Sequence, residues 1–146
     1  MNISIETSRK IALAYAAVCK PVCKELGLPQ TAFDILMFLG NNPKYKTASE
    51  IVDIRHIKAN LVSVNVERLV RDGYLVRQPV ESDRRKTELY CTEKAQPIIE
   101  RGRKLQESFF VRLFADMDDD TRTAFFAAMG ILEKNLNEML EAENEK

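Results

Sequence analysis

The sequence predicts a mainly helical α+β fold in which a helix–turn–helix runs directly into a two-stranded hairpin. Three observations lead to this prediction. Two short amphipathic patterns with helical spacing fill residues 47–71, Gly73 follows them, and two strand-like runs come next. Longer helical patterns lie at both ends of the chain. We therefore expect one intertwined domain in three segments, 1–28, 29–95 and 96–146, with the hairpin in the middle segment.

The first two helices are predicted to pack an apolar centre. The first spans Ser4–Glu25, where apolar side chains recur at steps of four and three residues: Ile11, Tyr15, Val18 and Val22. Gly27 ends it, and Pro29 suits the first turn of a second helix that runs to Leu39. The second helix is so rich in apolar residues that we expect it at the buried centre of the domain. Residues 40–43, Gly-Asn-Asn-Pro, should follow as a loop.

The helix–turn–helix is predicted to begin with a short helix that reaches Ile54. Thr47 and Glu50 fit a capping box at its start, in which each side chain bonds the other residue's free backbone N–H. His56 falls in the turn. A second helix is predicted over Lys58–Arg71, and the glycine two residues further on should end it in a left-handed conformation.

The hairpin is predicted from two short runs that resemble strands. These runs are Leu75–Pro79 and Thr87–Cys91, and the polar segment Val80–Lys86 should form the tip between them. The second run alternates as a half-buried strand does. Its predicted inward residues are Thr87, Leu89 and Cys91, and its predicted outward residues are Glu88 and Tyr90.

Two more helices are predicted after the hairpin. Thr92 should cap a long helix that continues to Met117, with a bend or a delayed start near Pro97. The last helix is predicted over Thr121–Leu140. Its apolar side chains recur at alternating steps of four and three residues: Phe125, Met129, Leu132, Leu136 and Met139. Such a seam predicts a partner helix, and the simplest partner is a second copy of the chain.

Composition excludes several classes of protein. No apolar run approaches the roughly 18 residues of a membrane span, so we expect no contact with a membrane. Charged residues interrupt the N-terminal apolar pattern, which favours an amphipathic helix over a signal peptide. Three cysteines, an odd number, disfavour a disulfide framework and favour the reducing cytoplasm. With one histidine and no catalytic motif, we expect no enzyme, no metal site and no cofactor.

The distribution of charge favours a nucleic-acid partner. The formal net charge of the chain is zero. Between Arg55 and Lys86, however, eight basic residues stand against four acidic ones, whereas acidic residues gather at 116–120 and near the C-terminus. A positive face on a neutral protein suits a binder that does not coat DNA indiscriminately. The alternative is that these charges are ordinary solvated helix faces.

Residues near the start of the second helix of a helix–turn–helix reach base edges in the major groove. Lysine can donate to guanine there, and asparagine can pair with adenine. The predicted readers are Lys58, Asn60, Ser63 and Asn65. The side chains predicted to dock this helix on its neighbours are Leu61, Val62, Val66 and Leu69.

The hairpin tip adds a second signal, because Asp83 is followed by three consecutive cations, Arg84, Arg85 and Lys86. An arginine on a projecting turn can enter the narrow and electronegative minor groove. Asp83 is expected to hold one guanidinium in place through a bidentate pair. A solvated basic loop is the alternative.

The order of these elements resembles the MarR family of winged helix–turn–helix regulators over about residues 5–140. The wing of that family carries a D-x-R-x-x-x-V-x-L-T pattern. Its positions are occupied here by Asp83, Arg85, Leu89, Cys91 and Thr92, with Leu and Cys in place of Val and Leu. The resemblance implies a winged helix–turn–helix with a two-stranded wing and long N- and C-terminal dimerisation helices. It also implies a homodimer on a pseudo-palindromic operator of double-stranded DNA, and a pocket for a small-molecule effector.

The resemblance also assigns roles to residues. It makes Arg85 the wing arginine, with Asp83 as its partner, and it supports Lys58, Asn60 and Ser63 as recognition-helix positions. Thr47 and Ser49 fall on positions that contact phosphate. His56 stands where the family often has Gly, and histidine tolerates a left-handed turn better than most residues.

Two further sets of residues have functional and structural interpretations. Cys19 and Cys23 lie four residues apart on one helix face, where they could sense oxidants or simply fill space beside the apolar stripe. Tyr15, Phe33 and Phe38 could line a pocket for a phenolic or other aromatic effector, or belong to the core.

The sequence thus predicts a dimeric, ligand-responsive regulator of transcription, with repression as the expected sign. One alternative is a winged-helix module that binds proteins and does not read DNA. The other is a small oxidoreductase or thiol enzyme, or a redox sensor, that uses Cys19 and Cys23.

Overall fold

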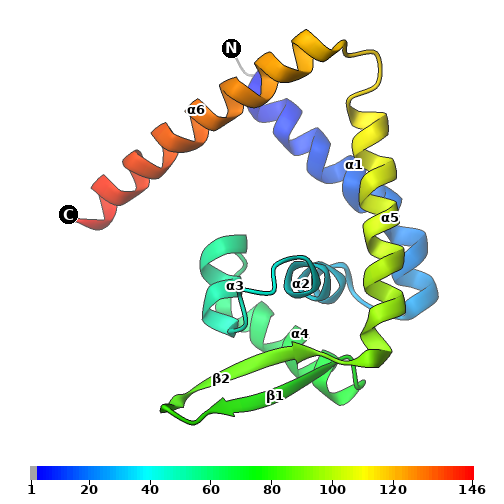
Figure 1. The fold of residues 1–146 in the computed structure, drawn as a ribbon, viewed down its shortest axis with the longest axis vertical. Helices are drawn as coiled ribbons and strands as arrows, with labels where there is room; N and C mark the ends of the chain where they lie inside the picture. The colour runs from blue at the N-terminus through cyan, green and yellow to red at the C-terminus, as the bar shows by residue number, and fades with distance from the viewer. Residues whose placement is uncertain (1–2) are drawn as a thin grey trace. The chain divides into compact units, whose positions relative to one another are not determined.

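The computed structural model describes residues 3–146, which form two compact units, one ending at Phe109 and one spanning Phe110–Lys146. It is mainly helical, with one two-stranded antiparallel sheet (Figure 1). The elements in chain order are α1 (Ile3–Leu26), α2 (Gln30–Asn41), α3 (Ala48–Arg55), α4 (Ala59–Arg71), β1 (Leu75–Val80), β2 (Asp83–Cys91), a 3₁₀ turn (Glu93–Ala95), α5 (Gln96–Leu113) and α6 (Asp119–Asn144). This order confirms the predicted fold class.

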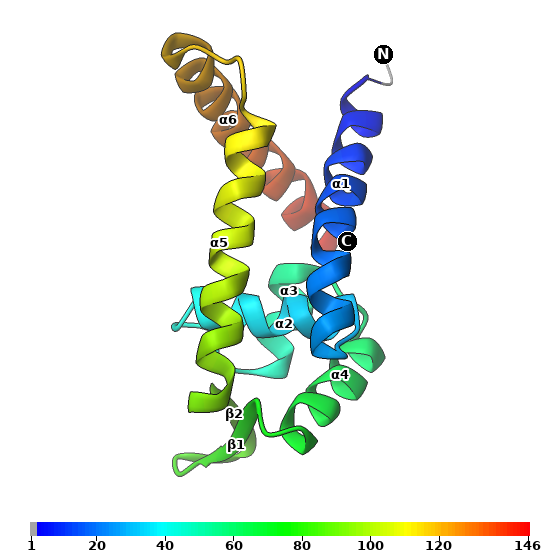
Figure 2. The same ribbon diagram turned by 90° about the vertical axis from the view of Figure 1, so that its right-hand side faces the viewer.

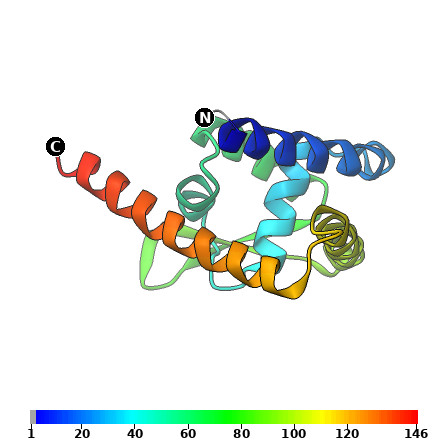
Figure 3. The ribbon, with the colours of Figure 1, turned by 90° about the horizontal axis from the view of Figure 1, so that it is seen from above.

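The core of the first unit is built around α2, as its apolar sequence predicted. Seven of its twelve residues are buried, and α1 crosses it (Figure 3). The buried cluster also takes in side chains from α3, α4, both strands and the start of α5. Its largest fully buried members are Phe33, Ile35, Leu36, Met37, Ile51, Leu69, Leu75 and Ile99.

Gly40 lies inside α2, whereas the sequence suggested a loop from that position. A Cβ at Gly40 would lie 2.9 Å from Cδ1 of Ile99 in α5, so the residue is needed for close packing of the two helices. The prediction was wrong because glycine was interpreted as a breaker when its role is steric. At the other end of α2, Pro29 occupies the N-cap position, with φ −62° and ψ 153°. The sequence had placed this proline inside the first turn, so it lies one position before its predicted place.

The helix–turn–helix agrees closely with its prediction. The capping box is complete, because Thr47 Oγ1 accepts from the Glu50 N–H and the Glu50 carboxylate accepts from the Thr47 N–H. His56 ends α3 in the left-handed region with φ 53°. Gly73 follows α4 with φ 83°, as expected for a left-handed helix end.

The wing differs from its prediction in where the strands end. Both strands are longer, and the four residues from Asp83 to Lys86 belong to β2 instead of a loop. Val80 pairs with Asp83 and Pro79 with Thr87, so residues 84–86 have no counterpart on β1 and form a bulge. Pro79 lacks an N–H and cannot donate to the partner strand at this point. The three cations thus lie on an irregular strand edge.

The predicted alternation of β2 is confirmed only in part. Leu89 is buried, as expected for the inward face. Thr87 is exposed, and Glu88, Tyr90 and Cys91 are all half-buried. The reason is that the hairpin projects from the core, so its inward face is covered near the base alone (Figure 1).

The helix after the wing starts late, as Pro97 suggested. A 3₁₀ turn precedes α5, and Pro97 then lies in the first turn of α5, where a proline is tolerated. Thr92 does not cap this helix, because its hydroxyl donates to the Gly73 carbonyl at 2.6 Å. The predicted capping role was therefore wrong: the side chain fixes the end of α4 instead.

The second unit contains the end of α5 and the whole of α6. The helix predicted to reach Met117 ends at Leu113, and Asp116 adopts a left-handed φ of 68° in the turn. Asp118 caps α6 by accepting from the Thr121 N–H at 2.7 Å, which extends the helix beyond its predicted start. No side chain of α6 is buried, and no helix in residues 3–146 is long and apolar enough to cross a membrane.

Candidate nucleic-acid interface

The second helix of the helix–turn–helix, α4, has one buried and one exposed face. Val62, Val66 and Leu69 are buried against the rest of the first unit. The exposed residues Asn60, Val64, Glu67 and Arg71 follow one another at steps of four and three, so they form a stripe along the opposite side. We call this stripe the outer face of α4. Leu61, predicted to dock the helix, is 45% exposed beside it, so that prediction was wrong.

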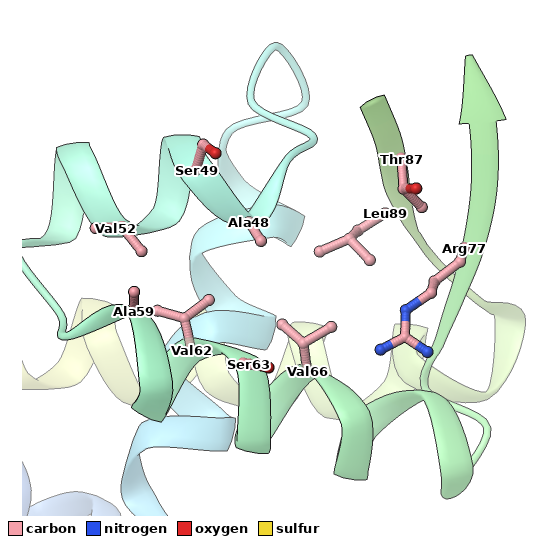
Figure 4. Close-up of a pocket in the computed structure, with 10 residues that line it drawn as sticks. All are labelled: Ala48, Ser49, Val52, Ala59, Val62, Ser63, Val66, Arg77, Thr87 and Leu89. Carbon is pink, nitrogen blue, oxygen red and sulfur yellow. The ribbon is translucent and has the colours of Figure 1, made fainter. Parts of the chain in front are cut away.

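The predicted base readers occupy three different environments. Lys58 precedes the first turn of α4, and its side chain makes no capping bond. Asn60 lies on the outer face. Ser63 is exposed too, but it points toward α3 and the wing (Figure 4). The structure therefore presents all three near the N-terminal half of α4, with Ser63 turned to one side.

Asn65 does not lie with these readers, although the sequence suggested it could. Its side chain is 7% exposed, and its Nδ2 donates to the Leu61 carbonyl at 2.8 Å within the helix. An amide that is buried and bonded to its own backbone has no edge left for a base. This expectation was wrong because Asn65 falls next to the buried face of α4 by helical spacing.

A concave surface lies between α3, α4 and the wing and encloses a cavity of about 240 Å³. Figure 4 shows its apolar floor and its polar rim. Val52, Val62, Val66 and Leu89 supply apolar surface, while Ser49, Ser63, Thr87 and Arg77 lie around them. The Arg77 guanidinium crosses from β1 to the Glu67 carboxylate on α4 at 2.8 Å. This ion pair ties the wing to the outer face of α4.

The cations of the wing are exposed at the β2 bulge. Asp83 accepts from the backbone N–H of Arg85 at 3.0 Å, so it fixes the main chain of the bulge. The expected clamp on a guanidinium is not formed. Within residues 3–146, no ion pair or hydrogen bond engages the guanidinium of Arg84 or Arg85. Both remain open to an external anion.

The base of the wing is anchored by contacts that the sequence did not predict. The Leu89 N–H donates to the Lys46 carbonyl at 2.6 Å, which attaches β2 to the segment before α3. The Lys46 ammonium lies 3.9 Å from Glu88 and 5.3 Å from the centre of the Tyr90 ring. Glu88 in turn accepts from the Tyr90 hydroxyl, and this bond raises the pKa of Tyr90. The contacts of Lys46 join residues more than 40 positions apart, so no local pattern could reveal them.

Thr47 and Ser49, the two predicted phosphate contacts, differ in what their hydroxyls already do. Thr47 Oγ1 donates to Glu50 Oε1 at 2.9 Å and accepts from the Glu50 N–H at 3.2 Å. A hydroxyl has one proton to donate, so that of Thr47 is committed to the cap. Ser49 is exposed on the first turn of α3 and has its donor available.

A further positioning residue, Arg68, lies at the far end of α4. Its Nη2 donates to the Gly27 carbonyl at 2.7 Å, and its Nε lies 3.7 Å from the Asp72 carboxylate. The bond to Gly27 fixes α4 against the turn between α1 and α2, and thereby the direction in which the outer face points.

The comparison with known proteins agrees with this geometry. Residues 26–86, which include α2, α3, α4 and most of the wing, match the model of the MarR family. The HTH-type transcriptional regulator PecS of Dickeya dadantii (strain 3937) is 25% identical over 134 residues, covering 90% of this chain and 81% of PecS. The chain is therefore similar to the transcriptional regulators of the MarR family, in sequence over this segment and over most of PecS.

Solved MarR-family structures share the fold over nearly the full chain. A MarR protein from Peptoclostridium difficile DA00132 has a TM-score of 0.83 at 20% identity, covering 97% of this chain and 92% of that one. A putative MarR-family regulator from Listeria monocytogenes, solved with a 26mer DNA, has a TM-score of 0.81 at 19% identity. That match covers 90% of this chain and 87% of the Listeria chain.

The two neighbouring cysteines, Cys19 and Cys23, are buried in the core where α1 meets α2. The Cys23 thiol donates to Gln30 Oε1 at 3.7 Å. Burial raises the pKa of Cys23 to about 11 and also raises the pKa of Cys19. A sensor cysteine needs an accessible thiolate, so these environments favour the packing interpretation of both residues.

The three aromatic residues considered for an effector pocket do not enclose one together. Phe33 is fully buried in the core. Phe38 is buried too and stacks on Tyr45 with ring centres 5.6 Å apart. Tyr15 is half-buried and accepts from Gln106 Nε2 at 2.9 Å, and burial raises its pKa to about 12. The contacts of Phe33 and Phe38 are those of core residues.

Proposed function

We propose that two copies of the chain bind a pseudo-palindromic operator, each placing the outer face of α4 in the major groove and Arg85 in the adjacent minor groove. The observation that carries this proposal is the pairing of the exposed outer face of α4 with an exposed cationic bulge on the hairpin. Figure 2 shows the backbone of α4 running into this hairpin. The Arg77–Glu67 ion pair links the two, so they can meet DNA as one surface.

The contacts proposed for DNA follow from the exposure of each side chain. Lys58 and Asn60 are the main readers of base edges, with Ser63 beside them. Ser49, Arg84 and Lys86 are proposed to contact phosphates, which position the protein without reading sequence. We leave out Asn65 because it is buried, and Thr47 because its proton is engaged.

The proposal of a homodimer rests on the second unit. All the side chains of α6 are exposed in the single chain, including the apolar seam predicted from the sequence: Phe125, Met129, Leu132, Leu136 and Met139. A long helix with an uncovered apolar stripe is poorly stable alone in water. A second copy would bury this stripe and hold two α4 helices at a fixed separation.

A response to a small aromatic effector is part of the proposal and rests on the resemblance to the MarR family, since Tyr15, Phe33 and Phe38 do not enclose a pocket together. Two recognition helices must meet major grooves about one helical turn, roughly 34 Å, apart. A ligand that binds more tightly to a dimer in which the two helices lie at another separation lowers the affinity for DNA. DNA in turn lowers the affinity for that ligand by the same coupling free energy. This would make the chain a ligand-responsive repressor.

Replacement of Arg85 by alanine tests the wing. We expect the affinity for a cognate duplex to fall. The slope of log affinity against log salt should become about one unit shallower, because the protein loses one cation that neutralises DNA phosphate charge. Affinity is measured by fluorescence anisotropy at several salt concentrations. The oligomeric state should stay the same.

Arg101→Ala is the matched control, since Arg101 is an exposed arginine whose guanidinium pairs with Glu25 of α1 at 2.6 Å. Its removal should leave both affinity and salt slope unchanged. An Arg85 variant that behaves like this control would contradict the wing contact. A failure of the wild-type protein to bind any duplex at physiological salt would favour the protein-interaction alternative, which its zero net charge supports.

A further inference from the structure

The middle of the outer face of α4 is apolar. Val64 is 67% exposed and lies one turn after Asn60 on the same stripe. Leu61, 45% exposed, lies next to it. Single exposed apolar residues are common on protein surfaces and need no explanation by themselves. Here the position matters, because this stripe is the surface that our proposed function places against base edges.

Val64 is flanked on the stripe by polar and charged residues, which sets it apart as the apolar part of this surface. Asn60 lies on the N-terminal side and Arg71 on the C-terminal side of the stripe. Between Val64 and Arg71, Oε2 of the Glu67 carboxylate accepts from Arg77 at 2.8 Å, which ties this acceptor to the wing. Val64 itself can neither donate nor accept a hydrogen bond.

The major groove offers one apolar group to such a side chain. All four bases present hydrogen-bonding atoms on that edge, and thymine alone adds a methyl group, at C5. A base atom that needs a hydrogen bond would be left unpaired against valine, which costs free energy. A thymine methyl group loses no hydrogen bond against valine, and its removal from water is favourable.

We propose that Val64 is a specificity-determining residue that contacts the C5-methyl group of a thymine in each half of the operator, with Leu61 flanking the same methyl. This inference rests on the proposed function. It adds that the operator carries a thymine at a fixed step from the base that Asn60 reads, and that the contact reads the methyl group.

The experiment removes the methyl group from the DNA. Duplexes are first selected by the wild-type protein from a randomised library, and each thymine of a selected duplex is then replaced by deoxyuridine. One symmetric pair of replacements should weaken binding about fourfold per half-site, the effect of about 0.8 kcal/mol for one buried methyl group. In Val64→Ala, the same replacement should have a clearly smaller effect, because the main contact of the methyl group is removed and only Leu61 remains beside it.

Val76→Ala is the matched control. Val76 is an exposed valine of β1 that pairs with Tyr90, on the sheet face opposite to Arg77 and Leu89, which line the concave surface with α4. This variant should keep the full uridine penalty. A selected duplex without conserved thymines, or a penalty that persists at its full size in Val64→Ala, would overturn the inference while leaving DNA binding intact. Failure to select any duplex would overturn the proposed function and the inference together.

Discussion

Asn60 and Asn65 carry the same side chain on the same helix, yet the structure gives them different tasks. Asn60 is exposed on the outer face of α4, and Asn65 donates to the Leu61 carbonyl from a buried position. Five residues of helix rotate a side chain by about 500°, so the second asparagine falls on the other side of the helix from the first. Residue type alone therefore does not show whether an asparagine reads a base or forms a structural hydrogen bond within the helix.

This difference gives a paired prediction. Asn65→Ala should lower the free energy of unfolding by about 1 kcal/mol, the typical net value of one hydrogen bond, and should leave affinity for DNA unchanged. Asn60→Ala should do the reverse, with a loss of about 1–3 kcal/mol in binding of the selected duplex. Chemical denaturation and anisotropy measure the two quantities. A loss of affinity in Asn65→Ala without a loss of stability would contradict the assignment.

Sequence analysis located the functional segment but assigned some side chains to the wrong task. Lys58, Asn60 and Arg85 were predicted and are exposed in the structure. The roles of Thr92 and Arg68 depend on carbonyl groups at Gly73 and Gly27, which approach them only after folding. No local pattern contains that information, because each contact joins separate elements.

At the scale of elements, the helix–turn–helix was the most predictable part and the wing the least. Capping boxes and left-handed helix ends are local signals, so Thr47, Glu50 and Gly73 were interpreted correctly. The bulge at residues 84–86 arises from the register between two strands and from a missing N–H at Pro79. Register is a property of the pair, which one strand's sequence does not determine.

The cap of α3 separates stability from DNA contact in a second prediction. Thr47→Ala should cost about 1 kcal/mol of stability, as for other lost N-caps, and should leave the salt slope of DNA binding unchanged. Ser49→Ala is the comparison: it should leave stability unchanged and weaken binding, because the Ser49 hydroxyl is available to phosphate. Thermal unfolding and anisotropy are measured on both variants. If both substitutions changed stability and DNA affinity equally, the roles assigned to the two hydroxyl groups, a cap for Thr47 and a phosphate contact for Ser49, would be contradicted.

At the scale of the whole molecule, the account depends on what covers α6. Its apolar seam was predicted from spacing alone, and the structure leaves that seam exposed in the single chain. Leu132→Glu should therefore yield monomers in sedimentation velocity, because a carboxylate in a dimer seam loses its hydration. Lys134→Glu places the same group on the opposite side of α6 and should remain dimeric. Monomeric wild-type protein at micromolar concentration would contradict the seam assignment.

The central claim is that two copies of α4, held at fixed separation, read one DNA site. The most direct measurement is selection of duplexes from a randomised library at physiological salt, followed by the mass of the complex in solution. The account predicts inverted half-sites whose centres lie about one helical turn, roughly 34 Å, apart, bound by two chains. Selection of unpaired half-sites bound by one chain, or of no sequence at all, would contradict it.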